Sequence, residues 1–318
     1  MPDRYKVAVV QATPVLFDRE ATVDKVVRLI AEAAAGDASL VLFPEAFIPA
    51  YPRGLAFGTV VGSRSPVGRD VWQRYWEQSV DVPGEVTARI GEAAAAHGVF
   101  VAVGVIEREG RYGNRPGGTV YCTTLYFGAD GTLLGKHRKL KPTAAERLIW
   151  GEGDGSTLTA LDTELGTIGG LICWEHYMPL ARAAMYAKGV EVWLAPTADS
   201  REGWQATVRH IALEGRCWVL SCNQFVTKSD YPADLPEIEM LADQPEIMSA
   251  GGSVIVSPLG EVVAGPLWNE EGILYAEVDL AEVARAKFDF DAVGHYSRPD
   301  VFRLVVDERE QRPVEFEK

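Results

Sequence analysis

The sequence predicts an α/β protein in which two mixed β-sheets carry helices on their outer faces. Apolar runs of strand length, such as residues 5–11 and 99–106, alternate with stretches of helical periodicity, such as residues 20–35. Hairpin signals such as Ala129-Asp130-Gly131 are inserted among them, which favours mixed rather than purely parallel sheets. No linker, internal repeat or low-complexity segment divides these elements, so a single large domain is expected.

The remaining elements follow from the same patterns. Further strands are expected at residues 39–43, 120–127, 132–140, 158–161, 167–173, 190–195, 218–222, 252–257 and 273–278. Further helices are expected at residues 85–97, 180–188, 204–216 and 281–288. We therefore expect a domain over residues 1–288 and a charged, Pro-containing C-terminal tail over residues 289–318.

Composition excludes several classes of protein. The chain has 318 residues, of which 47% are hydrophobic and 24% are charged, as in an ordinary soluble protein. Its net charge of −14 argues against a nucleic-acid partner, because no basic face is available to neutralise phosphates. The apolar runs are too short to span a bilayer, and the N-terminal residues lack the apolar core of a signal peptide. No membrane association is expected.

The four cysteines predict neither disulfides nor a metal site. They are Cys122, Cys173, Cys217 and Cys222, and none forms a C-x-x-C pair. Cys173 and His176 have no second pair of ligands at zinc-site spacing, so no metal is expected. Unpaired thiols are typical of a reducing compartment, and we expect a cytoplasmic protein.

Residues 166–180, GTIGGLICWEHYMPL, carry the most concentrated chemical signal. A buried strand is expected to end at Cys173, and Pro179 is expected to open a helix shortly after it. A thiol at a strand-to-helix turn meets outward-pointing backbone N–H groups and the positive end of a helix dipole. These conditions predict a lowered thiol pKa and a nucleophilic cysteine. The alternative is a small buried side chain with no chemical role.

Two other segments supply charged groups. Glu45 lies just beyond the predicted strand at residues 39–43, where α/β proteins place functional side chains. Residues 136–150, KHRKLKPTAAERLIW, combine a basic strand with Thr143 and Glu146 at the spacing of a capping box. Alternation places His137 and Lys139 on one face of that strand. A buried lysine beside a carboxylate and a thiol would stabilise a developing oxyanion, whereas the alternative is a solvated basic hairpin.

Taken together, these segments resemble the nitrilases, a branch of the carbon–nitrogen hydrolases that use a Glu-Lys-Cys triad. The resemblance covers roughly residues 5–304. It rests on LFPEAFIPAYPRG, KHRKLKPTAAERLIWGEGDG and GGLICWEHYMPLARAAMYAKG, with support from WLAPTADS, IALEGRCWVLSCNQF, GGSVIVSPLGEVVAGP and FDFDAVGHYSRPDVFRL. Three motifs in the right order are much more specific than any one of them.

The resemblance implies a role for each matching residue. It implies that Glu45 is the general base, Lys139 the cation that stabilises the oxyanion and Cys173 the nucleophile. Glu146 corresponds to the second glutamate that these enzymes place beside the triad. Three residues match substrate-binding positions: Tyr51 in the pocket wall, Trp174 through its backbone N–H, and His176 as a residue lining the site.

The resemblance also implies a fold, a reaction and an assembly. The fold is an α-β-β-α sandwich that pairs into a four-layer homodimer and can build into larger oligomers, with the tail at an oligomer interface. The reaction hydrolyses an organic nitrile to a carboxylic acid and ammonia through a thioimidate and a thioester on Cys173. The thiol supplies the covalent step, so no cofactor is expected. Residues 46–62 and 196–204 suggest an apolar pocket.

Several alternatives stay open from the sequence. The same triad would serve an amidase or carbamoylase, and cyanide is a further substrate for this chemistry. A catalytically silent assembly subunit would keep the fold without the reaction, although Glu45, Lys139 and Cys173 are all present. A redox-sensing thiol protein would need a second cysteine close to Cys173.

Overall fold

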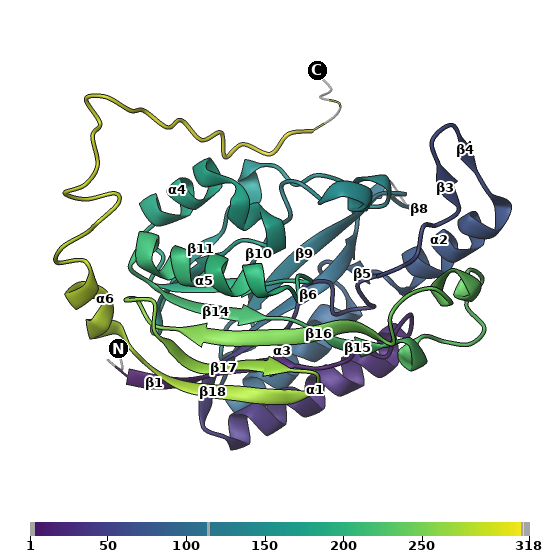
Figure 1. Ribbon diagram of the computed structural model, residues 1–318, viewed down its shortest axis with the longest axis horizontal. Coiled ribbons are helices and arrows are strands. Elements are labelled where there is room, and N and C mark those ends of the chain that lie inside the picture. The colour runs from purple at the N-terminus through teal and green to yellow at the C-terminus, as the bar shows by residue number, and fades with distance from the viewer. Residues whose placement is uncertain (1–3, 113–114, 313, 315–318) are drawn as a thin grey trace.

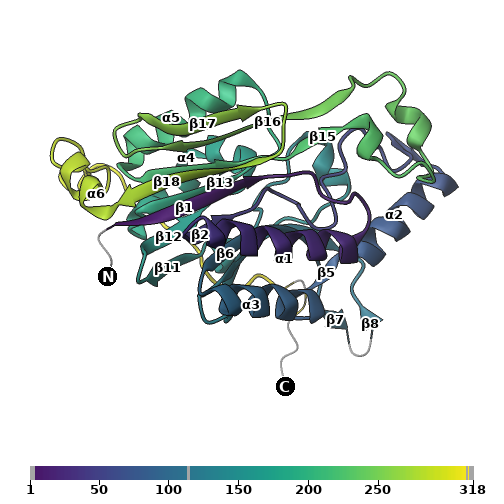
Figure 2. The same cartoon turned by 90° about the horizontal axis from the view of Figure 1, so that it is seen from below.

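The computed structural model describes residues 4–112, 115–312 and 314. Two mixed sheets lie face to face at its centre, and helices cover the outer face of each sheet (Figure 1). The layers are seen edge-on in Figure 2, with α4 and α5 on one side and α1 and α3 on the other. The predicted α-β-β-α sandwich is therefore confirmed.

The first sheet has the strand order β10-β9-β6-β2-β1-β18, with β5 paired to β6. Strands β1, β2 and β6 run parallel to one another, whereas the outer pairs are antiparallel. The strands are β1 (Arg4–Gln11), β2 (Ala38–Leu42), β5 (Val80–Asp81), β6 (Phe100–Arg108), β9 (Val120–Phe127), β10 (Leu133–Arg138) and β18 (Gly272–Asp279).

The second sheet has the order β11-β12-β13-β14-β16-β15, with β17 paired to β16. Strands β12, β13 and β14 are parallel. The strands are β11 (Ala160–Thr163), β12 (Gly166–Gly170), β13 (Val192–Pro196), β14 (Trp218–Cys222), β15 (Phe225–Thr227), β16 (Ile247–Val256) and β17 (Val262–Trp268). Two small hairpins complete the strands: β3 (Thr59–Val60) with β4 (Ser63–Arg64), and β7 (Arg111–Tyr112) with β8 (Arg115–Pro116).

The helices are α1 (Arg19–Ala35), α2 (Pro66–Gln78), α3 (Glu85–His97), α4 (Pro179–Ala187), α5 (Glu202–Gly215) and α6 (Leu280–Ala286). Helix α1 begins where the Asp18 carboxylate accepts a hydrogen bond from the Ala21 N–H at 3.0 Å. Helix α3 ends at Gly98, whose φ of 63° favours a residue without a side chain. None of the helices in the described ranges has the length and apolar character needed to cross a bilayer.

Strand alternation divides the interior into layers. In β1, Val7 and Val9 pack between the two sheets, whereas Ala8 and Val10 pack against α1 and α3. Leu42 of β2 belongs to the core between the sheets and is fully buried. A further apolar cluster lies between the second sheet and helices α4 and α5. The core between the sheets therefore fixes how one sheet sits on the other.

Helix α2, strand β17 and the strands of two or three residues, β3, β4, β5, β7, β8 and β15, were not predicted from the sequence. Helix α2 buries only Val71 and Tyr75 of its apolar side chains, so its apolar stripe is narrow and its polar residues dominate the pattern. Strand β17 contains Gly265 and Pro266, which interrupt the strand signal because proline cannot donate to a ladder. The strand expected to reach Cys173 ends at Gly170 instead.

The described residues after α6 form neither helix nor strand. This segment leaves α6 and runs past α4 on the outside of the molecule (Figure 1). Lys188 at the end of α4 pairs with Glu308, and Asp154 accepts a hydrogen bond from the Gln311 N–H at 2.7 Å. The tail is thus attached to the domain by polar contacts, while Phe302 and Val305 are exposed.

The core between the sheets gives a first prediction. Replacing Leu42 by Ala leaves a cavity where the sheets meet, so the free energy of unfolding should fall by about 2–5 kcal/mol. Urea denaturation followed by circular dichroism measures the change. The exposed Leu259 provides the control, since Leu259→Ala should cost less than about 0.5 kcal/mol. Equal losses in both variants would contradict this view of the core.

Candidate active site

The three residues of the predicted triad meet beyond the carboxyl ends of strands from both sheets. Glu45 follows β2 and Lys139 follows β10 in the first sheet, whereas Cys173 follows β12 in the second. All three side chains are buried. The crevice beyond the carboxyl ends of parallel strands is where α/β proteins place their ligands. The site therefore exists only when the two sheets are packed together.

Lys139 lies between two carboxylates. Its Nζ donates to Glu45 Oε1 and to Glu146 Oε2, each at 2.7 Å. The ammonium also lies 5.5 Å from the centre of the Trp150 ring, within cation–π range. Burial disfavours the charged form, but the Glu45 carboxylate, with further charges around it, raises the pKa of Lys139 well above its usual value. This lysine stays protonated.

Glu146 is fixed by the short 3₁₀ helix Ala144–Leu148. Its Oε2 accepts a hydrogen bond from the Thr143 N–H at 2.6 Å, the glutamate half of the predicted capping box. Its Oε1 accepts a hydrogen bond from the Tyr51 hydroxyl at 2.6 Å. Both carboxylate oxygens are thus engaged, and Tyr51 and Glu146 both reach the site as the sequence predicts.

Cys173 opens the 3₁₀ helix Cys173–Tyr177 in a left-handed backbone conformation, with φ at 51°. Non-glycine residues rarely adopt this conformation, and it turns the thiol toward the other two groups of the triad. The Thr197 hydroxyl donates a hydrogen bond to Cys173 Sγ at 3.2 Å. Thr197 was not singled out from the sequence, although its segment WLAPTADS contributed to the resemblance.

The prediction of a lowered thiol pKa is wrong. Burial, followed by the negative charge of Glu45, raises the pKa of the Cys173 thiol to about 12, although Lys139 and Thr197 act in the opposite direction. Cys173 starts a short 3₁₀ turn, and the expected helix begins only at Pro179. The resting side chain is therefore a neutral thiol, and a base must remove its proton.

Glu45 has the properties of such a base. Burial raises the pKa of its carboxyl, Lys139 lowers it and Glu146 raises it further, with a net rise above the usual value. Within the described part of the chain, Glu45 Oε2 is a buried oxygen without a hydrogen-bond partner. The backbone carbonyl of Glu45 accepts a hydrogen bond from Gln224 Nε2 at 2.8 Å, so the second sheet also holds this residue.

A carboxylate that the sequence did not single out joins the cysteine turn to the lysine strand. Glu175 is buried and accepts hydrogen bonds at 2.7 Å from the N–H groups of Ile172 and Leu140. His137 Nε2 lies 3.0 Å from its second oxygen. Burial opposes both charges, yet the pair holds the pKa of Glu175 below and that of His137 above their usual values. Ile172 and Leu140 are the chain neighbours of Cys173 and Lys139, so Glu175 fixes the cysteine turn relative to the lysine strand.

His176 lies behind the nucleophile. Trp193 Nε1 donates to His176 Nε2 at 2.8 Å, which makes Nε2 an acceptor and leaves the proton on Nδ1. Nδ1 then donates to the Cys173 carbonyl oxygen at 2.6 Å. Burial lowers the pKa of His176 to about 4, so the ring is neutral. This histidine braces the Cys173 backbone and is not among the residues that line the cavity.

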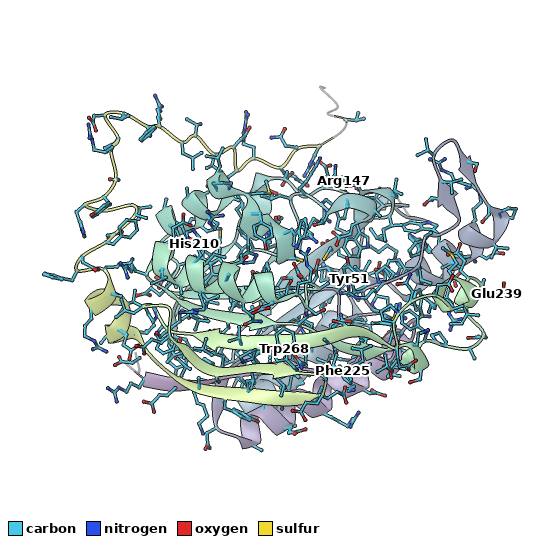
Figure 3. All side chains as sticks on the ribbon, in the orientation of Figure 1. Tyr51, Arg147, His210, Phe225, Glu239 and Trp268 are labelled. Carbon is cyan, nitrogen blue, oxygen red and sulfur yellow. The ribbon has the colours of Figure 1, made fainter. Side chains whose placement is uncertain are left out.

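A cavity of about 200 Å³ opens beside Cys173. Its lining residues are Tyr51, Arg53, Thr143, Glu146, Cys173, Trp174, Ala198, Asp199, Ser200 and Arg201. Tyr51 is labelled close to the middle of the view in Figure 3. The two segments expected to form the pocket do so. The expected apolar lining is found only in part, because charged side chains face the cavity beside aromatic and small ones.

Polar contacts hold the cavity wall. Trp174 Nε1 donates to Asp199 Oδ2 at 2.8 Å, and Arg201 Nε donates to Asp199 Oδ1 at 2.8 Å. The Arg53 guanidinium donates to the Ala198 carbonyl and lies over the Tyr51 ring. The described ranges contain no group of three His, Cys, Asp or Glu side chains arranged to hold a metal ion.

Comparisons with known proteins identify the family of the chain. The family model for the carbon–nitrogen hydrolases matches residues 6–288. The chain therefore belongs to the carbon–nitrogen hydrolase family.

Within that family, the chain belongs to the nitrilases. It is 52% identical to an aliphatic nitrilase of Sinorhizobium fredii, over 98% of both chains. It is also 52% identical to the bifunctional nitrilase/nitrile hydratase NIT4A of Lupinus angustifolius, over 98% of this chain and 88% of the relative.

Solved structures share the fold. Nit3 of Saccharomyces cerevisiae superposes with a TM-score of 0.69 at 22% identity, over 92% of this chain and 96% of that chain. A carbon–nitrogen hydrolase from Helicobacter pylori superposes with a TM-score of 0.71 at 21% identity, over 94% of this chain and 97% of that chain. The identities are low, so these likenesses concern the fold alone.

The Glu175 contacts give a second prediction. In Glu175→Gln, the amide loses the charge opposite His137 and presents N–H groups to backbone N–H groups. We expect a loss of about 3–5 kcal/mol in the free energy of unfolding, because a buried pair is broken. Chemical denaturation measures it. Glu152→Gln is the matched control, since the Glu152–Lys141 pair is about half exposed and should contribute less than about 1 kcal/mol. A tolerated Glu175→Gln would count against the bracing role.

Proposed function

We propose that this chain is a nitrilase that hydrolyses an organic nitrile to the carboxylic acid and ammonia through a covalent intermediate on Cys173. The main support is the convergence of Glu45, Lys139 and Cys173 beside one cavity. The high identity to proteins named as nitrilases supports nitriles as the substrate class.

In the first step, Glu45 takes the proton of the Cys173 thiol and the sulfur adds to the nitrile carbon. The new C–S bond forms as one C≡N π-bond breaks, and the nitrogen takes up the proton to give a thioimidate. A neutral resting thiol needs this base, because burial raises the pKa of Cys173 to about 12. The unpaired Glu45 Oε2 is the oxygen available for the transfer.

Water then completes the reaction in two further steps. Glu45 takes a proton from a water molecule that adds to the thioimidate carbon, and the tetrahedral species releases ammonia to leave a thioester. A second water attacks the thioester, breaks the C–S bond and returns the proton to the thiol. The net change is R–C≡N plus two H₂O to R–COOH plus NH₃. No redox step occurs and no organic cofactor is required.

Lys139 and Glu146 support these steps electrostatically. A protonated Lys139 stabilises negative charge on the tetrahedral species, and such a preorganised donor is commonly worth about 3–4 kcal/mol. Glu146 holds Lys139 by its Oε2 and Tyr51 by its Oε1. We assign the backbone N–H of Trp174 to the same oxyanion position. His176 holds the backbone of Cys173 by its hydrogen bond to the Cys173 carbonyl oxygen.

Amide hydrolysis is the second candidate. The same three residues would attack R–CO–NH₂, expel ammonia and reach the same thioester. The lupin relative is named as both a nitrilase and a nitrile hydratase, so amide release from the tetrahedral species belongs in the same assay.

We further propose that the protein acts as a homodimer in the cytoplasm. All four cysteines are buried and free, as suits a reducing compartment. Leu180 on α4 and Phe302 and Val305 on the tail expose large apolar side chains that a second copy would cover. Size-exclusion chromatography with light scattering tests the dimer.

The reaction itself gives the third prediction. Ammonia release is measured from aliphatic, aromatic and arylacetonitriles, from cyanide and from the matching amides. Wild type should release ammonia from nitriles, and folded Cys173→Ala should release none, because the other three cysteines are not among the residues that line the cavity. Turnover of amides alone would move the enzyme to the amidases. A folded wild type that turns over neither would favour a silent assembly subunit.

The coupled charges give a fourth prediction, on pH. Glu45 must be ionised to act as a base, and its pKa is raised above the usual value. The acid limb of kcat/KM should therefore have its midpoint above about 4.3, the ordinary glutamate value. Because Glu146 contributes to that rise, Glu146→Gln should move the limb to lower pH. Glu152→Gln is the control. An upward shift in Glu146→Gln would contradict the assignment.

A further inference from the structure

A second thiol lies inside the site and has no role in the reaction described above. Cys122 of β9 is buried, and its Sγ lies 3.5 Å from Glu45 Oε1. Its backbone carbonyl accepts a hydrogen bond from the Lys139 N–H at 2.8 Å. Cys122 therefore contacts both the glutamate and the lysine of the triad, from a strand that carries neither.

The two oxygens of Glu45 have unequal surroundings. Oε1 receives the ammonium of Lys139 at 2.7 Å and the thiol of Cys122 at 3.5 Å. Oε2 is buried and has no hydrogen-bond partner within the described ranges. With Lys139 as the one donor to Oε1, the carboxylate could tilt about the bond that joins it to the side chain. A second donor to the same oxygen, from a different strand, restricts that rotation.

We propose that Cys122 is a positioning residue whose S–H group holds Glu45 Oε1, so that the unpaired Oε2 stays directed toward the thiol of Cys173. This inference rests on the proposed role of Glu45 as general base. Cys122 is able to donate because burial, together with the neighbouring Glu45 charge, keeps the pKa of its thiol well above the usual value. It lies outside the cavity lining.

The weakness of a thiol as a donor suits this role. A thiol forms weaker hydrogen bonds than a hydroxyl, so it lowers the pKa of the carboxyl less than a hydroxyl in the same place would. A stronger donor would stabilise the ionised carboxylate and make it a poorer base. An alkyl side chain at position 122 would leave Lys139 as the single donor to Glu45 Oε1 among these two residues.

Several other charged or titratable groups act on Glu45 and must stay constant in a test. They are Lys139, Glu146, Cys173, Tyr51 and Tyr75. A substitution at position 122 leaves all five of these side chains in place, and comparing Cys122→Ser with the donor-free variants isolates the missing donor.

The fifth prediction compares donor-free and donor-bearing variants. Cys122→Ala and Cys122→Val remove the S–H group, the second while filling the space, and Cys122→Ser keeps a donor. Both donor-free variants should raise the acid limb of kcat/KM by about 0.5–1 pH unit, since the ionised carboxylate loses a hydrogen bond. Their kcat should fall roughly tenfold with little change in KM, since a misplaced base slows the chemical step. Cys122→Ser should stay at or below the wild-type limb.

A second readout does not depend on the substrate. The rate at which iodoacetamide alkylates Cys173 is measured against pH, with Cys173→Ala as the blank. The donor-free variants should show the same upward shift, because Glu45 accepts the Cys173 proton in this reaction too. Cys217→Ala is the matched control: it removes a buried thiol of equal size that lies among apolar residues under α4 and α5. Its profile should match that of wild type.

These readouts separate the inference from the proposed function. Identical acid limbs in wild type and the folded donor-free variants, or an equal shift in Cys217→Ala, would overturn the positioning role. If no variant turned over a nitrile but the alkylation profiles shifted as expected, the role of Cys122 would stand and the nitrilase reaction would fall. If Cys122→Ala does not fold, Cys122→Val carries the same comparison.

Discussion

The structure depends above all on a lysine buried between two glutamates. Removing three charges from water is costly, and the cost is offset only if each charge meets its partner at hydrogen-bond distance. Lys139 meets Glu45 and Glu146 at 2.7 Å. Its backbone is fixed as well, since its N–H donates to Cys122 and its carbonyl accepts from Gly153, both at 2.8 Å. The position of this ammonium therefore decides where both carboxylates lie.

The same cluster explains how a neutral thiol can coexist with an ionised base. Burial raises the pKa of the Glu45 carboxyl, and the second carboxylate, Glu146, adds to this rise, so Glu45 keeps a tendency to take a proton although Lys139 opposes it. Cys173 is buried next to that negative charge, which keeps its proton in place until a reaction begins. The arrangement holds a base and an acid of unequal pKa side by side, which suits proton transfer at the moment of attack.

Packing between the sheets is what assembles these groups. Glu45 and Lys139 belong to the first sheet, and Cys173 and Thr197 follow strands of the second. Near the site, hydrogen bonds connect the two sheets. Gln224 donates to the Glu45 carbonyl, and Glu175 accepts from backbone N–H groups of both the cysteine turn and the lysine strand. Apolar packing holds the two sheets together, and these few hydrogen bonds orient the side chains of the site.

The sequence by itself predicted the two-sheet architecture and most helices and strands, because periodicity and strand-end residues are local signals. Its resemblance to a family pointed to Glu45, Lys139 and Cys173, which the structure brings together. It missed α2, whose buried stripe is narrow, and strand β17, and it predicted a lowered pKa for the Cys173 thiol where burial raises it. Only the tertiary structure decided the direction of that pKa shift, the contacts of Glu175 and His176, and the mixed lining of the cavity. All of these depend on burial and on the spacing of charged groups that lie far apart in the sequence. Neither is a property of a single segment of the chain.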